Sequence, residues 1–233
     1  MKTLKNLLRK VSQFNNNEFR KEFSRNIEYH LYVIASQRSA DYVYNNMQQA
    51  IGYDTKKDVH DRAIAELKKV YTNEQLCMEF GVYTGSTINY FARQLPSAIF
   101  HGFDSFEGLP EFWRQGFDQG QFKVDLNKLH FEKNITLHPG WFDATLPKFK
   151  SEAGQIAFLH VDCDLYSSTK IIFDNLKGKI KPGTLILFDE YFNYPFWENH
   201  EYKAFQELVQ SENLKYEYLA YSKHDEQVLV KIC

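Results

Sequence analysis

The feature of this sequence that most constrains the fold is an alternation of short apolar runs with amphipathic stretches, which starts near residue 74. The apolar runs are QLCMEF, AIFHGF, NITLHP, IAFLHVD and GTLILFDE, and the amphipathic stretches include STINYFARQL, SSTKIIFDNL and HEYKAFQELV. Such alternation predicts βα units and a parallel sheet that binds its ligands at the carboxyl ends of the strands. Two final runs, KYEYLAYS and EQVLVKI, are joined by a short polar turn and predict an antiparallel hairpin.

The chain before residue 74 has a different pattern, so we divide it into an N-terminal helical segment, residues 1–73, and an α/β domain, residues 74–233. Residues 18–71 are charged, interleaved with aromatic residues and free of proline, and their apolar residues recur at helical spacing. The first residues are amphipathic, with Leu4, Leu7, Leu8 and Val11 on one helical face and Lys2, Lys5 and Arg9 elsewhere. This pattern favours a docking helix or a dimer contact over contact with a membrane surface.

The composition indicates a protein that binds small molecules. A chain of 233 residues with 43% hydrophobic residues suits one domain with an appended helical segment, and a net charge of −2 does not favour nucleic-acid binding. No apolar run approaches the roughly 20 residues that span a bilayer. Cys77, Cys163 and Cys233 lack the spacing of a metal site or a disulfide framework, so we expect a reducing compartment, by default the cytoplasm.

A glycine turn follows the first predicted strand of the α/β domain, in EFGVYTGSTINYFA. Gly81 and Gly85 permit a tight turn and close approach of a ligand to the backbone, and Ser86 or Thr87 can cap the next helix. The spacing matches neither the dinucleotide fingerprint nor the ATP-binding loop. Glu79 and Asp104, at two strand ends, suit S-adenosylmethionine, whose cationic amino acid and ribose hydroxyls need acceptors. The competing interpretations are a turn that serves packing alone and an Asp104 that only caps a helix.

Acidic residues follow two further predicted strands. Asp162 and Asp164 come after IAFLHV, and Asp189 and Glu190 come after LILF. Because neighbouring strands lie about 4.8 Å apart, acids at two adjacent strand ends can share one ion, and oxygen ligands favour Mg²⁺ over Zn²⁺. Without a cation, mutual repulsion and desolvation of these carboxylates would cost stability. The competing interpretation is that Asp164 caps the next helix and Glu190 is a solvated loop residue.

Four motifs, in this order, resemble the macrocin O-methyltransferase family, which methylates sugar hydroxyls in macrolide and aminocoumarin biosynthesis. They are EFGVYTG, GFDSFEGLP, HVDCDLYSST and FDEY, and the resemblance covers roughly residues 74–233. It implies a class I S-adenosylmethionine-dependent methyltransferase with a Rossmann-like fold, a mostly parallel seven-stranded sheet and dependence on magnesium. It also implies that the N-terminal helices form a lid or the contact of a homodimer.

The resemblance also implies a role for each motif. The positions that correspond to cofactor-binding residues are Glu79, Gly81, Gly85, Asp104 and Ser105. The positions that correspond to metal ligands are Asp162, Asp189 and Glu190. Related enzymes often carry aspartate or asparagine where this chain has Glu190, so its longer side chain would alter the coordination. Residues 140–147, GWFDATLP, correspond to a loop beside the cofactor, although Trp141 and Phe142 fit a protein core equally well.

A sugar hydroxyl is a poor nucleophile, so methyl transfer requires a group that lowers its pKa and a group that takes its proton. A divalent cation held by the acids would lower that pKa and orient the oxygen toward the sulfonium methyl. We expect Asp162 to accept the proton, with Asp164 and His160 as the next candidates. We expect residues 107–121 and 191–197 to close the site, and His200 to be solvated or satisfied in the core.

Two other functions are open on the sequence alone. The pair Asp162-x-Asp164 after an apolar strand also resembles the metal-binding acids of nucleotide-sugar glycosyltransferases. That interpretation assigns no function to the glycine turn or to Asp104. A non-catalytic S-adenosylmethionine-binding module would not need Asp162, Asp189 or Glu190. Under the methyltransferase interpretation the acceptor is a small molecule with a hydroxyl, a sugar in the first place, and the sequence does not select among glycosides, polysaccharide units and phenols.

Overall fold

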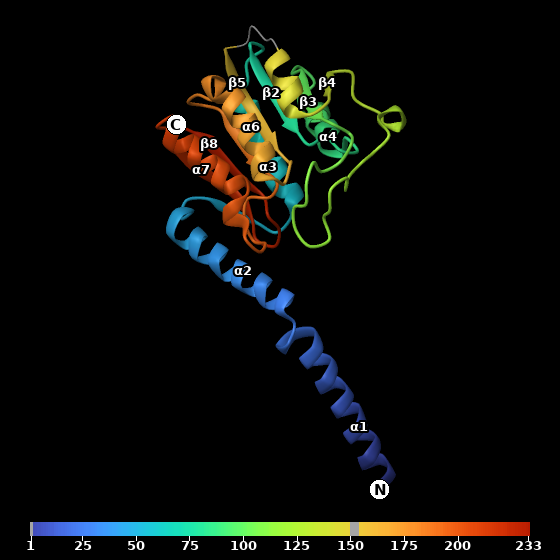
Figure 1. Cartoon of the computed structure of the whole chain (residues 1–233). Helices are drawn as coiled ribbons and strands as arrows, with labels where there is room; N and C mark the ends of the chain where they lie inside the picture. The colour runs from blue at the N-terminus through green and yellow to red at the C-terminus, as the bar shows by residue number, and fades with distance from the viewer. Residues whose placement is uncertain (1, 150–153) are drawn as a thin grey trace.

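An eight-stranded sheet forms the centre of the protein, whose computed structural model describes residues 2–149 and 154–233 (Figure 1). The strand order is β1-β7-β8-β6-β5-β2-β3-β4. The strands are β1 Ile51–Tyr53, β2 Gln75–Phe80, β3 Phe100–Asp104, β4 Ile135–Pro139, β5 Gln155–Val161, β6 Leu185–Phe188, β7 Tyr216–Ser222 and β8 Val228–Ile232. The pairings of β8 with β6 and β7 are antiparallel, and the other pairings are parallel. The predicted mostly parallel sheet and C-terminal hairpin are therefore confirmed.

The number of strands differs from the seven that were expected. The additional strand, β1, lies within residues 18–71, which were predicted to be helical throughout. Ile51, Gly52 and Tyr53 pair in parallel with residues 220–222 of β7. An unpaired edge of β7 would expose a row of backbone donors and acceptors, and β1 covers part of it. A strand of three residues is too short to leave a recognisable alternation in the sequence, which is why the prediction missed it.

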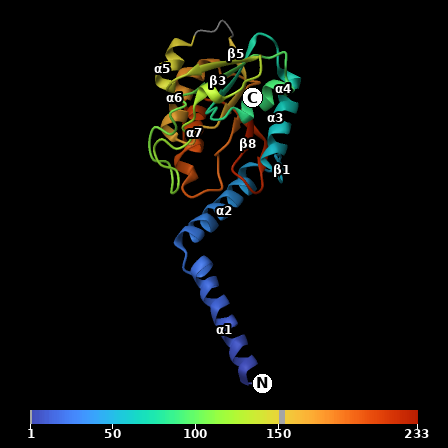
Figure 2. The ribbon, with the colours of Figure 1, turned by 90° about the vertical axis from the view of Figure 1, so that its right-hand side faces the viewer.

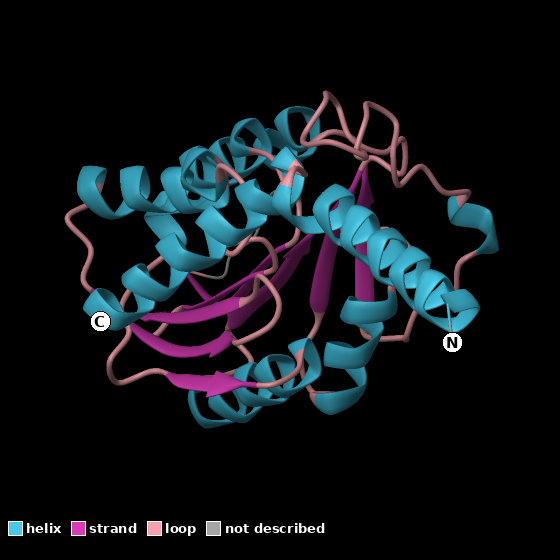
Figure 3. Ribbon diagram, turned by 90° about the horizontal axis from the view of Figure 1, so that it is seen from below, coloured by secondary structure: helices cyan, strands magenta, loops and turns pink. Residues whose placement is uncertain are grey.

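Helices cover both faces of the sheet (Figure 3). Helices α3 Lys56–Val70 and α4 Ser86–Gln94 pack on one face, and α6 Tyr166–Leu176 and α7 Glu201–Ser211 pack on the other. Met78 and Phe80 of β2 join the core under α6 and α7, whereas Cys77 joins the core under α3 and α4. Because both faces are buried, the central strands appear in the sequence as continuous apolar runs. The shorter helical segments are η1 Arg20–Ser24, η2 Leu126–Lys128, α5 Phe142–Thr145, η3 Leu146–Lys148, η4 Lys177–Lys179 and η5 Trp197–Asn199.

Helices α1 Lys2–Phe19 and α2 Ile27–Asn46 extend away from the α/β domain (Figures 1 and 2). The C-terminal half of α2 reaches the domain, where the Tyr42 and Tyr218 hydroxyls lie 2.6 Å apart. The amphipathic face predicted for residues 4–11 lies outside the side chains that the structure describes, and the lid or dimer role of these helices stays a prediction. Among the described helices, none combines the length and the apolar character needed to cross a bilayer.

Candidate active site

The carboxyl ends of β2, β3, β5 and β6 open into a cavity of about 640 Å³, a volume typical of small-molecule sites. The predicted site residues that line this cavity are Gly81, Ser86, Asp104, Ser105, Asp162, Asp164, Asp189 and Glu190. Three other predicted site residues, Glu79, Gly85 and His160, are not part of its lining. Trp141 and Phe142 do line it, which supports the placement of residues 140–147 beside a bound ligand.

Two glycines shape the turn that follows β2. Gly81 has a φ of +89°, and a Cβ at this position would lie 1.6 Å from the backbone oxygen of Asp162. Only glycine therefore allows the β2 turn to approach the end of β5 this closely. Gly85 has a φ of +78° and is itself the N-cap of α4, without a capping side chain. The prediction that Ser86 caps this helix is thus wrong, because Ser86 is the first residue of α4 and faces the cavity.

Asp104, at the end of β3, holds the glycine turn in place. Its Oδ2 accepts hydrogen bonds from the backbone N–H groups of Val82 and Tyr83, both at 2.7 Å, and its Oδ1 accepts one from Phe106 at 2.6 Å. A carboxylate has about four acceptor positions, so Asp104 retains capacity for a hydroxyl in the cavity. Asp104 therefore shapes the turn in addition to facing the space expected for a ribose.

Glu79 and His160 form a buried pair beneath the turn. They are partners across β2 and β5, and His160 Nδ1 lies 3.0 Å from Glu79 Oε2. Burial lowers the pKa of His160, but the carboxylates of Asp189 and Glu79 more than offset this effect and raise the pKa to about 10. Burial raises the pKa of Glu79. His160 is therefore protonated at neutral pH and Glu79 lies below the cavity wall, which argues against His160 as a base and against direct contact of Glu79 with a ligand.

Asp162, Asp189 and Glu190 form an acid cluster in which carboxylate oxygens from all three residues lie within 4.8 Å of one another. The parallel pairing of β5 with β6 brings the residues that follow these strands together, as predicted. Glu190 is only 9% exposed, so it is not a solvated loop residue. Burial, followed by the charge of Asp189, raises the pKa of Asp162 and of Glu190. The cluster therefore holds negative charge at an energetic cost that a bound cation would reduce.

Lys56 of α3 already supplies one positive charge to the acid cluster. Its Nζ lies 2.5 Å from Asp189 Oδ2. Burial would raise the pKa of Asp189, but the nearby imidazoles of His160 and His60 and the charge of Lys56 hold this pKa well below its usual value. Glu190 Oε2 is buried and has no hydrogen-bond partner among the described residues. An all-oxygen donor set with an unpartnered oxygen fits a hard divalent cation, which would share Asp189 with Lys56.

Asp164 is a buried acid in the cavity wall. It has a φ of +64°, is 8% exposed and lines the cavity. Helix α6 has Leu165 as its N-cap without a capping side chain, so the competing interpretation of Asp164 as a helix cap is wrong. Burial, followed by the charge of Asp189, raises the pKa of Asp164 to about 7. A carboxyl group with this pKa gains and loses a proton near neutral pH.

The sequence interpretation missed three polar residues beside the acids. Lys56 and His60 are one turn apart on α3, so they face the sheet together, and burial lowers the pKa of His60. Glu201 at the start of α7 is fully buried and accepts hydrogen bonds from the N–H groups of Cys163 and Glu190, at 3.4 and 3.3 Å. Glu201 thereby ties together the loops that follow β5 and β6. The sequence feature that could have revealed Lys56 and His60 is their position on the apolar face of a helix. That helix lies in the segment that was expected to act only as a lid or dimer contact.

Residues 107–121 form a wall of the cavity, as expected for a closing segment. Glu111 accepts a hydrogen bond from Ser167 at 2.6 Å, and Arg114 pairs with Glu226 at 3.0 Å. These contacts tie the segment to α6 and to the β7–β8 hairpin. Residues 191–197 were expected to close the site as well, but Tyr191 and Tyr194 have no exposed surface. Residues 191–197 are not part of the cavity lining, and the aromatic residues Tyr191, Phe192, Tyr194 and Trp197 are buried in the core. The expectation was wrong because these residues serve packing.

Comparison with known proteins relates the chain to methyltransferases. Residues 78–191 match a family described as a methyltransferase domain. Over 106 residues the chain is 32% identical to 8-demethyl-8-(2,3-dimethoxy-alpha-L-rhamnosyl)-tetracenomycin-C 4'-O-methyltransferase of Streptomyces olivaceus, which covers 38% of this chain and 40% of that protein. Over 111 residues it is 28% identical to demethyldecarbamoylnovobiocin O-methyltransferase of Streptomyces niveus, which covers 40% of this chain and 41% of that protein. The chain thus matches about two fifths of the length of these curated relatives.

The fold is similar to that of a solved methyltransferase. The crystal structure of CalS11, a calicheamicin methyltransferase, matches with a TM-score of 0.60 at 23% sequence identity, over 74% of this chain and 77% of that one. The structural match covers more of this chain than the two sequence matches do. Residues 78–191 therefore match a methyltransferase-domain family, and the chain has the Rossmann-like fold of the class I methyltransferases.

Proposed function

We propose that this protein transfers a methyl group from S-adenosylmethionine to a hydroxyl of a sugar or of a glycosylated small molecule, as the resemblance to the macrocin O-methyltransferases implies. The observation that carries this proposal is the contact of the glycine turn with the acid cluster inside a methyltransferase domain, where Gly81 lies directly against the backbone of Asp162. The names of the two curated relatives support the acceptor class, because they describe O-methyltransferases of a rhamnosyl-tetracenomycin and of a novobiocin precursor skeleton.

The cofactor would bind on the glycine side of the cavity. Gly81 lines this side of the cavity, and Ser86 and Ser105 add hydroxyl groups to the same wall. Asp104 would accept hydrogen bonds from the ribose hydroxyls with the lone pairs that the backbone leaves free. The Trp141 ring would exclude water from the transferred methyl group.

The acceptor hydroxyl would bind on the acid side. A divalent cation held by Asp162, Asp189 and Glu190 would lower the pKa of this hydroxyl and orient its oxygen. We favour Asp164 over Asp162 as the proton acceptor, because Asp164 lines the cavity and its pKa is raised to about 7. Lys56 would keep Asp189 ionised throughout the reaction cycle.

The glycosyltransferase alternative has no support in these observations. Asp162 and Asp164 lie in a domain that matches methyltransferases, and the glycine turn faces the same cavity. A non-catalytic module would not explain why Asp164, Asp189 and Glu190 are buried beside Asp162 at the carboxyl ends of the strands.

Isothermal titration calorimetry with S-adenosylmethionine and with UDP-sugars, each with and without Mg²⁺, tests the proposal. We expect S-adenosylmethionine to bind and UDP-sugars not to bind. Transfer of a radiolabelled methyl group to glycosylated acceptors then tests catalysis, and chelation should reduce it. Binding of UDP-sugars in place of the methyl donor would contradict the proposal, and full methyl transfer after chelation would remove the cation from it.

A further inference from the structure

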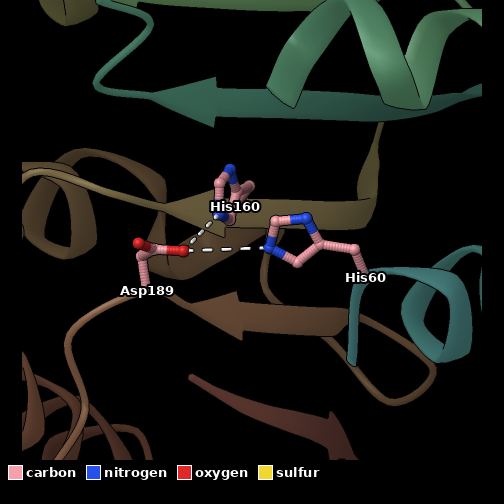
Figure 4. A group of neighbouring side chains, drawn as sticks. All are labelled: His60, His160 and Asp189. Atoms are coloured by element: carbon pink, nitrogen blue, oxygen red, sulfur yellow. Dashed lines mark ion pairs between the residues drawn. The ribbon is translucent and has the colours of Figure 1, made fainter. Parts of the chain in front are cut away.

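Below the acid cluster, three side chains from separate elements converge on one point (Figure 4). His60 comes from α3, His160 from β5, and Asp189 from the loop after β6. All three are buried, with exposed fractions of 6%, 0% and 4%. The Nε2 atoms of His60 and His160 lie 3.8 and 3.7 Å from the same atom, Asp189 Oδ1. The site therefore brings two imidazole nitrogens and one carboxylate oxygen together inside the protein.

None of these three atoms has a hydrogen-bond partner among the described residues. Separations of 3.7 and 3.8 Å exceed the hydrogen-bond range of about 2.7–3.2 Å, so protons on the two imidazoles do not satisfy the carboxylate oxygen. Buried polar atoms are almost always hydrogen-bonded in native proteins, and three atoms without a hydrogen bond at one point indicate a common partner. That partner must lie between the two histidines and Asp189.

The separations favour a metal ion over a water molecule as this partner. Ligands about 2.0–2.1 Å from a tetrahedral ion lie about 3.4 Å from one another. Groups hydrogen-bonded to a tetrahedral water at about 2.8 Å lie about 4.6 Å from one another. The observed 3.7 and 3.8 Å are closer to the metal geometry. Two imidazoles and a carboxylate are also a donor set that suits Zn²⁺ and similar ions, whereas Mg²⁺ prefers oxygen alone.

The groups around the three atoms are those that usually support metal ligands. His160 Nδ1 lies 3.0 Å from Glu79 Oε2, so its N–H points to a carboxylate and its Nε2 faces the shared point. Asp189 Oδ2 is held by Lys56, which leaves Oδ1 for the shared point. Asp189 also lines the cavity, which gives an ion a path of entry and a source of water as a further ligand.

We propose that His60, His160 and Asp189 bind a divalent transition-metal ion, Zn²⁺ in the first place, which fastens α3 to the ends of β5 and β6. On binding, the proton on His160 Nε2 leaves to solvent and the ion takes its position, while Nδ1–H stays on Glu79. The ion connects the N-terminal helical segment to the methyltransferase domain. This site is distinct from the all-oxygen acid cluster, although Asp189 belongs to both, and it does not depend on the proposed enzymatic activity.

Titration of the chelator-treated, full-length protein with Co²⁺ tests this proposal, because Co²⁺ bound to imidazoles absorbs visible light. We expect one Co²⁺ per chain, displaced by Zn²⁺ but not by excess Mg²⁺, and a higher melting temperature with Zn²⁺. His60→Gln should weaken Co²⁺ binding at least about a hundredfold. Glu79→Gln keeps all three ligands and should weaken it about 10- to 100-fold.

Two control variants separate this site from its surroundings. Asp162→Asn removes an acid-cluster ligand and should change Co²⁺ affinity less than tenfold. His101→Gln alters a histidine that instead pairs with His138, and it should leave the affinity unchanged. Circular dichroism checks that each variant is folded. If His60→Gln does not fold, the Co²⁺ affinity of Glu79→Gln tests the proposal instead. Absence of stoichiometric Co²⁺ binding, or binding lost in Asp162→Asn but retained in His60→Gln, would overturn the proposal.

Discussion

The two sides of the cavity obtain their structure from different physical sources. On the cofactor side, Gly81 and Asp104 form a turn whose shape comes from backbone conformation and from three hydrogen bonds to one carboxylate. On the acid side, Asp162, Asp189 and Glu190 are held together in spite of their charge, and burial raises the pKa values of Asp162 and Glu190. We therefore expect the cofactor side to be sensitive to side-chain volume and the acid side to be sensitive to charge and pH.

The largest expected effect concerns pH and the acid side. The pKa of His160 is raised from 6.5 to about 10, so the stability that its protonation contributes is complete below about pH 6.5 and is lost as the pH rises towards 10. The loss is on the order of 5 kcal/mol at most, because one pKa unit corresponds to about 1.4 kcal/mol. Urea unfolding of the metal-free protein across this pH range measures it. An equal pH dependence in His160→Gln would show that other groups are responsible.

The charge of Asp189 is expected to control turnover without affecting the cofactor. Asp189→Asn removes a cluster charge and should lower methyl transfer at least about a thousandfold, or about 4 kcal/mol in the activation free energy. Calorimetry should show unchanged affinity for S-adenosylmethionine. Asp174→Asn, on the exposed surface of α6, serves as the matched control and should behave as the wild type. Weakened cofactor binding in Asp189→Asn would break the proposed division between the two sides.

On the cofactor side, we expect an added side chain to lower the free energy of unfolding most at Gly81. Gly81→Ala places a Cβ 1.6 Å from the Asp162 backbone oxygen at a φ of +89°, and the clash and the backbone strain should together cost about 3 kcal/mol of unfolding free energy. Gly116→Ala is the matched control, because Gly116 has a φ of +88° but no atom within 4 Å of an added Cβ. Its cost should be about 1 kcal/mol, from backbone strain alone. Equal costs in the two variants, measured by urea unfolding, would show that close packing at Gly81 is not essential.

The smallest expected effect is at Asp104. Asp104→Ala removes a predicted ribose contact and the acceptor for three backbone N–H groups, so it should weaken S-adenosylmethionine binding about 10- to 100-fold. Asp104→Asn keeps one oxygen acceptor and should have an intermediate effect. Calorimetry compares the two variants. Unchanged affinity in Asp104→Ala would show that the glycine turn holds its shape without this carboxylate.

Sequence patterns predicted the sheet well because both faces of its central strands are buried. The runs that contain Cys77, Phe158 and Leu187 became β2, β5 and β6, and the βα order placed their carboxyl ends together. The predictions failed where local pattern and tertiary contact diverge. Strand β1 forms by pairing with the edge of β7, and Tyr191, Phe192, Tyr194 and Trp197 fill the core and do not close over a ligand.

The sequence by itself determined the fold class, the glycine turn and the acids at the strand ends, since these depend on short-range periodicity and on the rule that parallel strands end at one edge. Only the tertiary structure decided which groups surround those acids. Lys56 and His60 lie more than 100 residues from Asp189 in the chain, and packing of α3 on the sheet brings them within 2.5 and 3.8 Å of its carboxylate. Contacts across such a separation leave no periodic trace in the sequence, because they depend on how a helix docks and not on how it forms.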